Sequence, residues 1–155
     1  MAEWTNNALQ TINPGETAIF SVTTSPCRRG FIRHVDGEGT FSLSGWVPNN
    51  GSCPCQQAKT ATYLVNFHAN IAVPTGETVG PITVAITVDG ATVPSSQMIS
   101  TPSAVEEFNN VAVGKEVPVW RGCCQTVAIR NTSTIPILMQ NAAIQLTRPD
   151  LVMSY

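Results

Sequence analysis

Hydrophobic and polar side chains alternate most regularly over residues 63–73 of this 155-residue chain. The large apolar residues fall on one parity, whereas Asn66, His68 and Asn70 fall on the other. A period of two predicts a strand with one buried and one exposed face. We expect the three polar residues on the exposed face, where hydrogen bonding or an interface suits them better than catalysis.

A second alternating run covers residues 82–88 and ends at Asp89 and Gly90. An Asp-Gly pair before another short extended run, residues 91–93, is a strong signal for a tight hairpin turn. A long strand followed by a hairpin predicts an antiparallel sheet at the centre of the fold.

The rest of the chain consists of short extended runs separated by Gly, Pro, Asn and Asp. Pro118 interrupts one run and predicts that its strand lies at a sheet edge or bulge. Residues 103–106 fit a capping box that opens one helical turn, and a strand over residues 105–113 is the competing interpretation. Further strands are expected at residues 8–12, 17–22, 31–35, 40–46, 97–100, 115–120, 125–130 and 135–147. About ten short strands without a long helix predict an all-β, antiparallel sandwich or jelly roll in one domain.

This pattern divides the chain into three parts. Residues 1–12 are expected to be an N-terminal arm with a first short strand, and residues 13–148 the β-jelly-roll domain. Residues 149–155 are expected to be a tail outside the sheet. Within the domain, residues 47–57 are the least regular stretch and predict a surface loop.

Charged residues make up 12% of the chain, and the net charge is −2. The charged share in ordinary soluble proteins is about 25%. Asn, Thr, Ser and Gln replace the missing charges, which indicates a surface that faces other protein, with an uncharged monomer as the alternative. Basic residues are scattered, so we expect no nucleic-acid partner. No apolar run could span a bilayer and no secretory signal is visible, so we expect no membrane partner and synthesis in a cytoplasm.

The cysteines number five, and this odd number excludes complete pairing within one chain. Reduced, packed thiols are the first interpretation, because a cytosol is reducing. A disulfide formed after release, for example between Cys27 and Cys123 or Cys124, is the second. A zinc site with His34 or His68 is disfavoured, because the cysteine spacings lack the gap of structural zinc pairs. The candidate disulfide or thiol cluster comprises Cys27, Cys53, Cys55, Cys123 and Cys124.

No motif in the chain predicts an active site. The adjacent carboxylates Glu106 and Glu107 would face opposite ways in a strand, and no nucleophile elbow or phosphate loop is present. We therefore expect no enzyme activity, no catalytic residue, no metal and no cofactor.

Large aromatics in polar surroundings are candidate interface residues, because aromatic side chains concentrate at interface centres. Trp4 lies in the polar arm, where it could anchor the arm on a neighbouring protein. The full set of interface candidates is Trp4, Leu9, Ile12, Asn66, His68, Asn70 and Trp120.

Several motifs resemble a group of small proteins of Firmicutes bacteria and their tailed phages, described only by that context. The resemblance covers nearly the whole chain. Its motifs are LQTINPGE (9–16), CRRG (27–30), VNFHANIAVPTG (65–76), TPSAVEEFNNV (101–111), VWRGCC (119–124), NTST (131–134) and QNA (140–142).

The order of short strands also resembles the C1q and tumour-necrosis-factor jelly roll, whose members are compact trimers. Together the two resemblances imply a bacteriophage virion protein, a homotrimer on the outside of the capsid as a decoration or head-fibre protein. Its expected partners are itself and the major capsid protein or another virion protein. The alternative is a ligand-binding, lectin-like module on a bacterial spore or cell surface.

Overall fold

The alternation over residues 63–73 belongs to β6 (Thr60–Ala72), the longest strand of the protein. Its buried and less buried residues alternate along almost the whole strand, as predicted. Strand β10 (Asn109–Trp120) pairs with one edge of β6, and β12 (Ile137–Thr147) pairs with the other. All three strands are antiparallel to their neighbours, so β6 is an interior strand of one sheet.

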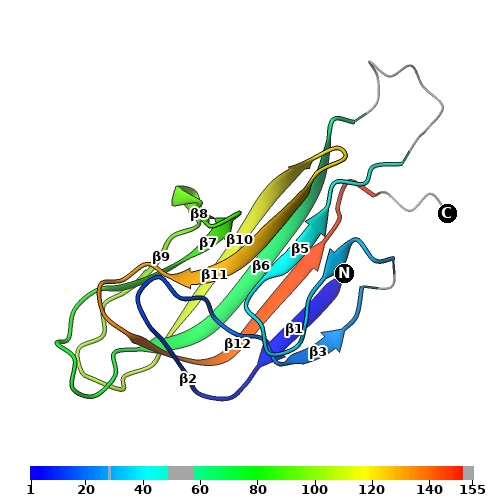
Figure 1. Cartoon of the computed structure of the whole chain (residues 1–155). Coiled ribbons are helices and arrows are strands. Elements are labelled where there is room, and N and C mark those ends of the chain that lie inside the picture. The colour runs from blue at the N-terminus through cyan, green and yellow to red at the C-terminus, as the bar shows by residue number, and fades with distance from the viewer. Residues whose placement is uncertain (28, 49–57, 152–155) are drawn as a thin grey trace.

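This first sheet, sheet A, has six strands in a computed structural model that describes residues 1–27, 29–48 and 58–151 (Figure 1). The strands run in the order β10-β6-β12-β1-β3, and β2 pairs with β12 beyond the end of β1. The bounds of the remaining strands are β1 (Ala2–Asn6), β2 (Gln10–Ile12) and β3 (Val22–Ser25).

Sheet B also has six strands, in the order β4-β5-β11-β7-β8, and β9 pairs with the free part of β7. The hairpin predicted at Asp89 and Gly90 joins β7 to β8, and both residues have positive φ, 49° and 82°. The strands are β4 (Ile32–Arg33), β5 (Phe41–Ser44), β7 (Ile82–Val88), β8 (Ala91–Thr92), β9 (Met98–Ser100) and β11 (Cys124–Asn131). A short 3₁₀ turn, η2 (Pro94–Ser96), precedes β9.

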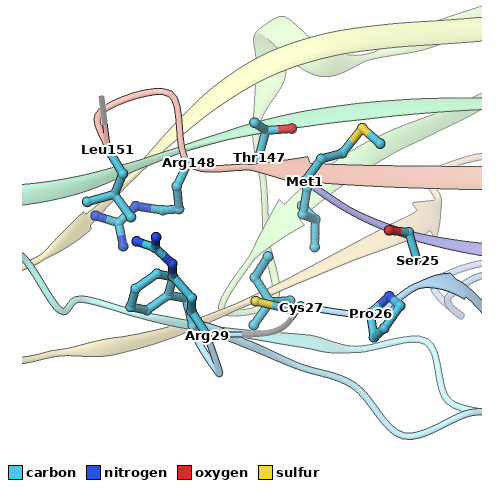
Figure 2. Close-up of a pocket in the computed structure, with 11 residues that line it drawn as sticks. Met1, Ser25, Pro26, Cys27, Arg29, Thr147, Arg148 and Leu151 are labelled. Atoms are coloured by element: carbon cyan, nitrogen blue, oxygen red, sulfur yellow. The ribbon is translucent and has the colours of Figure 1, made fainter. Parts of the chain in front are cut away.

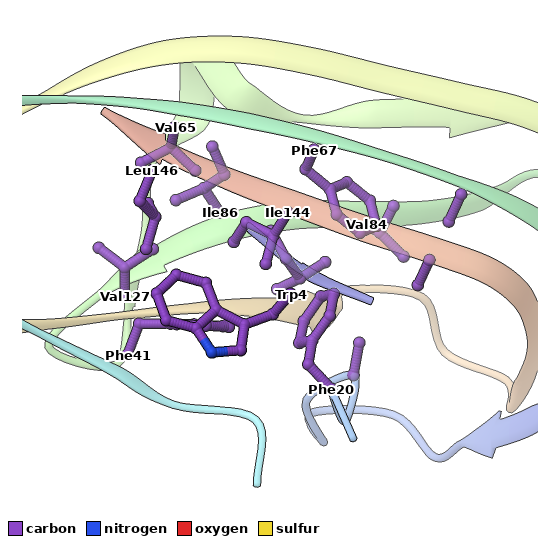
Figure 3. Packing of buried hydrophobic residues seen from close by; sticks show 14 of the residues in the cluster. Trp4, Phe20, Phe41, Val65, Phe67, Val84, Ile86, Val127, Ile144 and Leu146 are labelled. Atoms are coloured by element: carbon purple, nitrogen blue, oxygen red, sulfur yellow. The ribbon is translucent and has the colours of Figure 1, made fainter. Parts of the chain in front are cut away.

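The inward faces of the two sheets form one apolar core (Figure 3). Phe20 and Phe41 meet edge to face with ring centroids 5.4 Å apart, and Phe41 meets Trp4 at 5.0 Å. Burial of each such side chain contributes about 1.5–3 kcal/mol. The all-β, two-sheet antiparallel prediction is therefore confirmed.

The predicted N-terminal arm is wrong for residues 1–7, which were expected to lie outside the sheets. Strand β1 lies inside sheet A, between β12 and β3, and Trp4 is 3% exposed. Ala2 and Asn6 are buried with it, while Glu3 and Thr5 alternate outward. The strand was missed because it is short and rich in polar residues. Tertiary pairing, including a bond from Asn6 Nδ2 to the Ile19 oxygen at 3.0 Å, holds it in place.

Two other expectations need correction. Residues 17–22 form isolated bridges, Thr17 to Arg130 and Phe20 to Glu38, so the strand there begins later than predicted. Residues 103–106 form a turn rather than a helix, and β10 then continues unbroken to Trp120. Pro118 lies within β10, which pairs only with β6 among the described strands, so the predicted edge position is confirmed.

The described part of the tail leaves the sheet after β12, and Asp150 forms an ion pair with Arg148 at 2.7 Å. In the described ranges no helix has the length and apolarity needed to cross a lipid bilayer.

Candidate functional site

The outer face of sheet A carries the polar residues predicted on the exposed side of β6. His68 is exposed, and Asn66 and Asn70 are half-buried, while Phe67 and Ala69 between them point into the core. The strand pairing therefore places these three residues in one row along the sheet surface.

Small residues surround this row on both sides. Ala112 of β10 and Ala143 of β12 pair with His68, so a methyl group flanks the imidazole on each neighbouring strand. Gly114 pairs with Asn66, and a Cβ on Gly114 would lie 2.8 Å from Asn66 Oδ1. The absence of that carbon lets the Asn66 amide lie over β10. The His68 side chain therefore projects from a face on which the neighbouring side chains are small.

A shallow hollow of about 380 Å³ lies beside His68, between Asn66, Ala112, Gly114 and Gln145. Its polar groups are amides and an imidazole, all uncharged when the histidine is neutral. Neutral groups lose less hydration free energy than ions when a second surface covers them. The hollow is therefore suited to contact with another protein surface.

The amides on this face are partly engaged with each other. Asn110 Nδ2 donates to Asn70 Oδ1 at 3.2 Å, and Gln145 Nε2 donates to Glu3 Oε2 at 3.3 Å. Glu3 and Glu116 are the carboxylates on the outward parity of the described strands, and both lie at the margins of the row. The centre of the face therefore holds no carboxylate, lysine or arginine among the described side chains.

An exposed aromatic side chain lies at one end of the same face. Trp120, the last residue of β10, is 61% exposed and pairs with Thr60 at the start of β6. Leu64 and Pro118 share its parity, so this end of the face is more apolar than the amide row. Trp120 is accessible to a partner, as an interface residue must be.

Three other interface candidates do not lie on this face. Trp4 and Ile12 are 3% and 2% exposed and belong to the core, so neither is available to a partner in this fold. Leu9 is exposed, but it lies in the connection between β1 and β2. The prediction failed at Trp4 and Ile12 because a tryptophan among polar neighbours gives the same sequence signal in an arm and in a short internal strand.

The three cysteines in the described part of the chain do not form a common cluster. Cys27, Cys123 and Cys124 are free thiols, and Cys53 and Cys55 lie outside the described residues. Cys27 lines a hollow beside the loop after β3, whereas Cys123 in the turn after β10 and Cys124 at the start of β11 are exposed. The suggested disulfide between Cys27 and this pair is therefore not formed.

His34 has a structural environment. Its ring stacks on Phe41 with centroids 4.2 Å apart, and its two ring nitrogens each lie 3.0 Å from a backbone oxygen, those of Thr40 and Phe20. Over the described residues, no three His, Cys, Asp or Glu side chains converge as metal ligands would.

The titratable groups with shifted pKa values belong to a brace between the two sheets. Burial raises the pKa of the Tyr63 hydroxyl, and it outweighs the opposing effect of the Arg148 charge. Burial alone would also raise the pKa of Asp150, but hydrogen bonds from Arg148 and from the Thr62 backbone lower it overall. The Arg148 guanidinium lies over the rings of Phe31 and Tyr63. The polar partners of this brace all belong to the fold, and the pKa shifts follow from burial and hydrogen bonds within it.

No protein-family model matches the chain, and no curated protein matches it either. Solved structures do match in fold. The globular domain of zebrafish complement 1qA protein has 10% sequence identity and a TM-score of 0.60, with 96% of this chain and 95% of that chain covered. The Eiger TNF from S. frugiperda has 12% identity and a TM-score of 0.59, with 99% and 93% covered. The protein is a single-domain antiparallel jelly roll of the C1q and tumour-necrosis-factor type.

The small residues around His68 were missed from the sequence. Ala112 and Gly114 alternate with Val111 and Val113, so their outward parity was visible. Their position next to β6 follows from strand order, and no single-sequence signal gives that order.

Proposed function

We propose that this chain is a non-enzymatic structural protein that assembles as a homotrimer through the outer face of sheet A. We further propose that the trimer binds the outside of a bacteriophage capsid as a decoration or head-fibre protein. The observation that carries the self-association is an uncharged face of small residues beside a long, unpaired sheet edge.

The composition of this face favours burial. Ala112, Gly114 and Ala143 keep the backbone accessible, so a neighbouring surface can approach closely around His68. Amide groups at such a surface need partners once water leaves, because an unsatisfied buried polar group costs about 1–3 kcal/mol. Asn66, Asn70 and Gln145 can each donate and accept, so polar groups at the β10 edge of a second copy can satisfy them.

The free edge of β10 supplies the second half of the contact. Strand β10 has twelve residues and no ladder partner other than β6 among the described strands, and such an edge is an aggregation hazard unless something covers it. If the β10 edge of one copy packs on the outer face of sheet A in the next, each copy uses two different surfaces. Such contacts are heterologous, and they close into a ring when the rotation between copies is suitable. The resemblance to the C1q and tumour-necrosis-factor fold favours three copies.

The place of the trimer on a capsid rests on the sequence resemblance to phage proteins and on the low charge of the chain. A decoration protein acts by adhesion, and neutral hydrogen-bonding groups contribute directional contacts that depend little on salt. The remaining exposed apolar residues, Leu9, Ile19 and Val22 among them, offer contacts for the major capsid protein or another virion protein.

The trimer is tested by the mass of the purified full chain in solution, measured by light scattering with and without reductant. We expect a mass near three chains of 16.5 kDa in both conditions. His68→Asp should lower the mass to one chain, because it places a carboxylate on each copy at the centre of the face. Thr92→Asp, which adds the same charge to the exposed β8 in sheet B, is the matched control and should leave the trimer intact.

A monomeric wild-type chain would rule out the self-assembling trimer. If the His68→Asp variant remains a trimer, the interface lies on another surface. The capsid role is tested separately, by labelling purified phage particles with antibody against the chain. Label on the capsid shell supports it, whereas absence from particles together with sugar binding by the free protein would favour a spore- or cell-surface module.

A further inference from the structure

An exposed tryptophan that follows β5 is held in place by a stack of other side chains. The Trp46 ring stacks on Phe31 with ring centroids 5.2 Å apart and an interplanar angle of 19°. The Arg148 guanidinium lies over the same Phe31 ring, and its Nη1 donates to the Trp46 oxygen at 3.1 Å. Trp46 is nevertheless 49% exposed. The indole is therefore fixed in orientation while much of the residue stays open to solvent.

Trp46 lines a hollow of about 550 Å³, which we call the Trp46 hollow. Its volume lies within the range of small-molecule pockets, roughly 300–1,000 Å³. Phe31 lines a different hollow, the one beside Cys27 and Arg148 (Figure 2). The rest of the Trp46 hollow comes from the end of β5 and the turn into β11, namely Ser44, Gly45, Val47, Arg121, Gly122, Cys123 and Cys124.

The polar groups of the Trp46 hollow suit a neutral ligand, since none of its described lining residues carries a carboxylate. Ser44 Oγ accepts a bond from the Trp46 backbone N–H at 3.2 Å, and a hydroxyl in this position can donate its own hydrogen to a ligand. Backbone bonds between Gly45 and Cys123 fix the turn, and a carbonyl oxygen there can accept a second bond. Arg121 has an interaction of its own, so the ligand does not need its charge.

We propose that the Trp46 hollow binds a neutral pyranose sugar of the glucose type, stacked on the indole. When all ring hydroxyls are equatorial, both faces of the sugar present C–H groups and the hydroxyls lie around its edge. The C–H hydrogens are slightly positive and the indole face is negative, so the two faces attract each other. Stacking also removes apolar area of both partners from water. The Ser44 hydroxyl and the turn carbonyls then bond the sugar hydroxyls.

Two features of the chain favour this ligand. The stack on Phe31 holds the indole before the ligand arrives, so binding costs little ordering of the aromatic side chain. The amide row of sheet A contributes nothing to the hollow, so the site can be tested whether or not the chain forms a trimer.

Cellotriose is a suitable probe, because its linked glucose rings have flat C–H faces. Glycerol, which has hydroxyls without a ring face, is the control compound. Titration of the full-length protein with cellotriose, followed by the NMR signal of the Trp46 indole N–H, should saturate. Glycerol at the same hydroxyl concentration should leave that signal in place. A titration without saturation by cellotriose would overturn the proposal.

Trp46→Ala tests the aromatic ring and should raise the dissociation constant for cellotriose at least tenfold. Trp46→Phe keeps a ring on Phe31 and should weaken binding less than the alanine variant does. Trp120→Ala is the matched control, because Trp120 is also an exposed tryptophan but lies outside the lining. That control should bind cellotriose as the wild type does, and thermal unfolding of all three variants verifies their fold. Equal affinities of wild type and Trp46→Ala would contradict the stacking.

The thiols of the hollow provide a second readout that needs no variant. Saturating cellotriose should slow the alkylation of Cys123 and Cys124 by iodoacetamide several-fold, as peptide mass mapping can show. Cys27 lines the other hollow and should react at an unchanged rate. Protection of Cys27 instead would place the sugar elsewhere and overturn the proposal. A trimer that binds no cellotriose would refute this site alone, whereas a monomer that binds it would refute only the proposed assembly.

Discussion

The Arg148 guanidinium carbon lies 4.9 Å from the centroid of the Tyr63 ring, and both residues bond to the β5 segment of sheet B, Arg148 to the Trp46 oxygen and Tyr63 to the Ser44 oxygen. Tyr63 belongs to β6 of sheet A, and its hydroxyl donates to the backbone oxygen of Ser44 in β5 of sheet B. Asp150 then accepts two hydrogen bonds from the same guanidinium, at 2.8 and 2.7 Å. A cation and a carboxylate that follow β12, and a phenol from the distant β6, thus form one brace.

Removal of the phenolic hydroxyl should weaken this brace. Tyr63→Phe keeps the ring under Arg148 but leaves the Ser44 oxygen without its side-chain donor. The expected loss is about 1–3 kcal/mol of unfolding free energy, the cost of an unsatisfied buried polar group. Denaturant unfolding of wild type and variant measures it. An unchanged midpoint with an unchanged slope would mean that the hydroxyl bond contributes nothing net.

The acid stability of the protein should depend on Asp150. Its pKa is lower in the folded than in the unfolded state, so its contribution to stability is present above the unfolded value, about 4, and disappears as pH falls further. Wild type should therefore be more stable than Asp150→Asn at pH 7, and the difference should shrink below about pH 4. Chemical unfolding at several pH values tests this, and a pH-independent difference would contradict it.

Gly45 should tolerate no side chain. A Cβ there would overlap the Trp120 oxygen and lie 2.6 Å from the Cys123 oxygen, both in the backbone of the turn after β10. We expect Gly45→Ala to cost about 1–3 kcal/mol, the usual cost of overpacking. Gly80→Ala is the matched control, since nothing lies within 4 Å of its Cβ position. Thermal unfolding of the two variants should separate them, and equal melting temperatures would contradict the close approach.

Two tryptophans predict opposite outcomes for one substitution. Trp4→Ala should destabilise the fold by about 3–5 kcal/mol, because it empties a core position packed against Phe41. Trp120→Ala should change the unfolding free energy of the isolated chain by less than about 0.5 kcal/mol, because the side chain is exposed. Unfolding curves measured on dilute protein, where assembly is minimal, make the comparison. A mild Trp4→Ala variant would restore the docking-arm hypothesis.

The long strands and the Asp89-Gly90 hairpin could be predicted because their signals are local. Alternation along β6 also gave the outward parity of His68, and Pro118 gave the edge position of β10. Strand β1 could not be predicted in the same way. Its inward residues include Asn6, whose burial depends on a hydrogen bond to Ile19.

The row of amides on β6 and the Trp46 hollow also differ in whether their signals are local in the sequence. The row of amides on β6 was predicted, because it needs only one strand. The hollow with Trp46, Cys123 and Cys124 depends on the meeting of segments far apart in the chain, which a single sequence does not reveal. Likewise, a single tryptophan among polar neighbours in β1 could not tell an interface from a core.

The position of β12 between β6 and β1 has a consequence for how the protein is made. Strand β12, the last of the described strands in chain order, occupies the middle of sheet A, where it pairs with β1. Until the ribosome has released that segment, β1 and β6 have no neighbour between them, and their edges stay open to other nascent chains. Sheet A can therefore close only after β12 has left the ribosome. A premature stop codon before β12 would yield an aggregating fragment instead of a smaller domain.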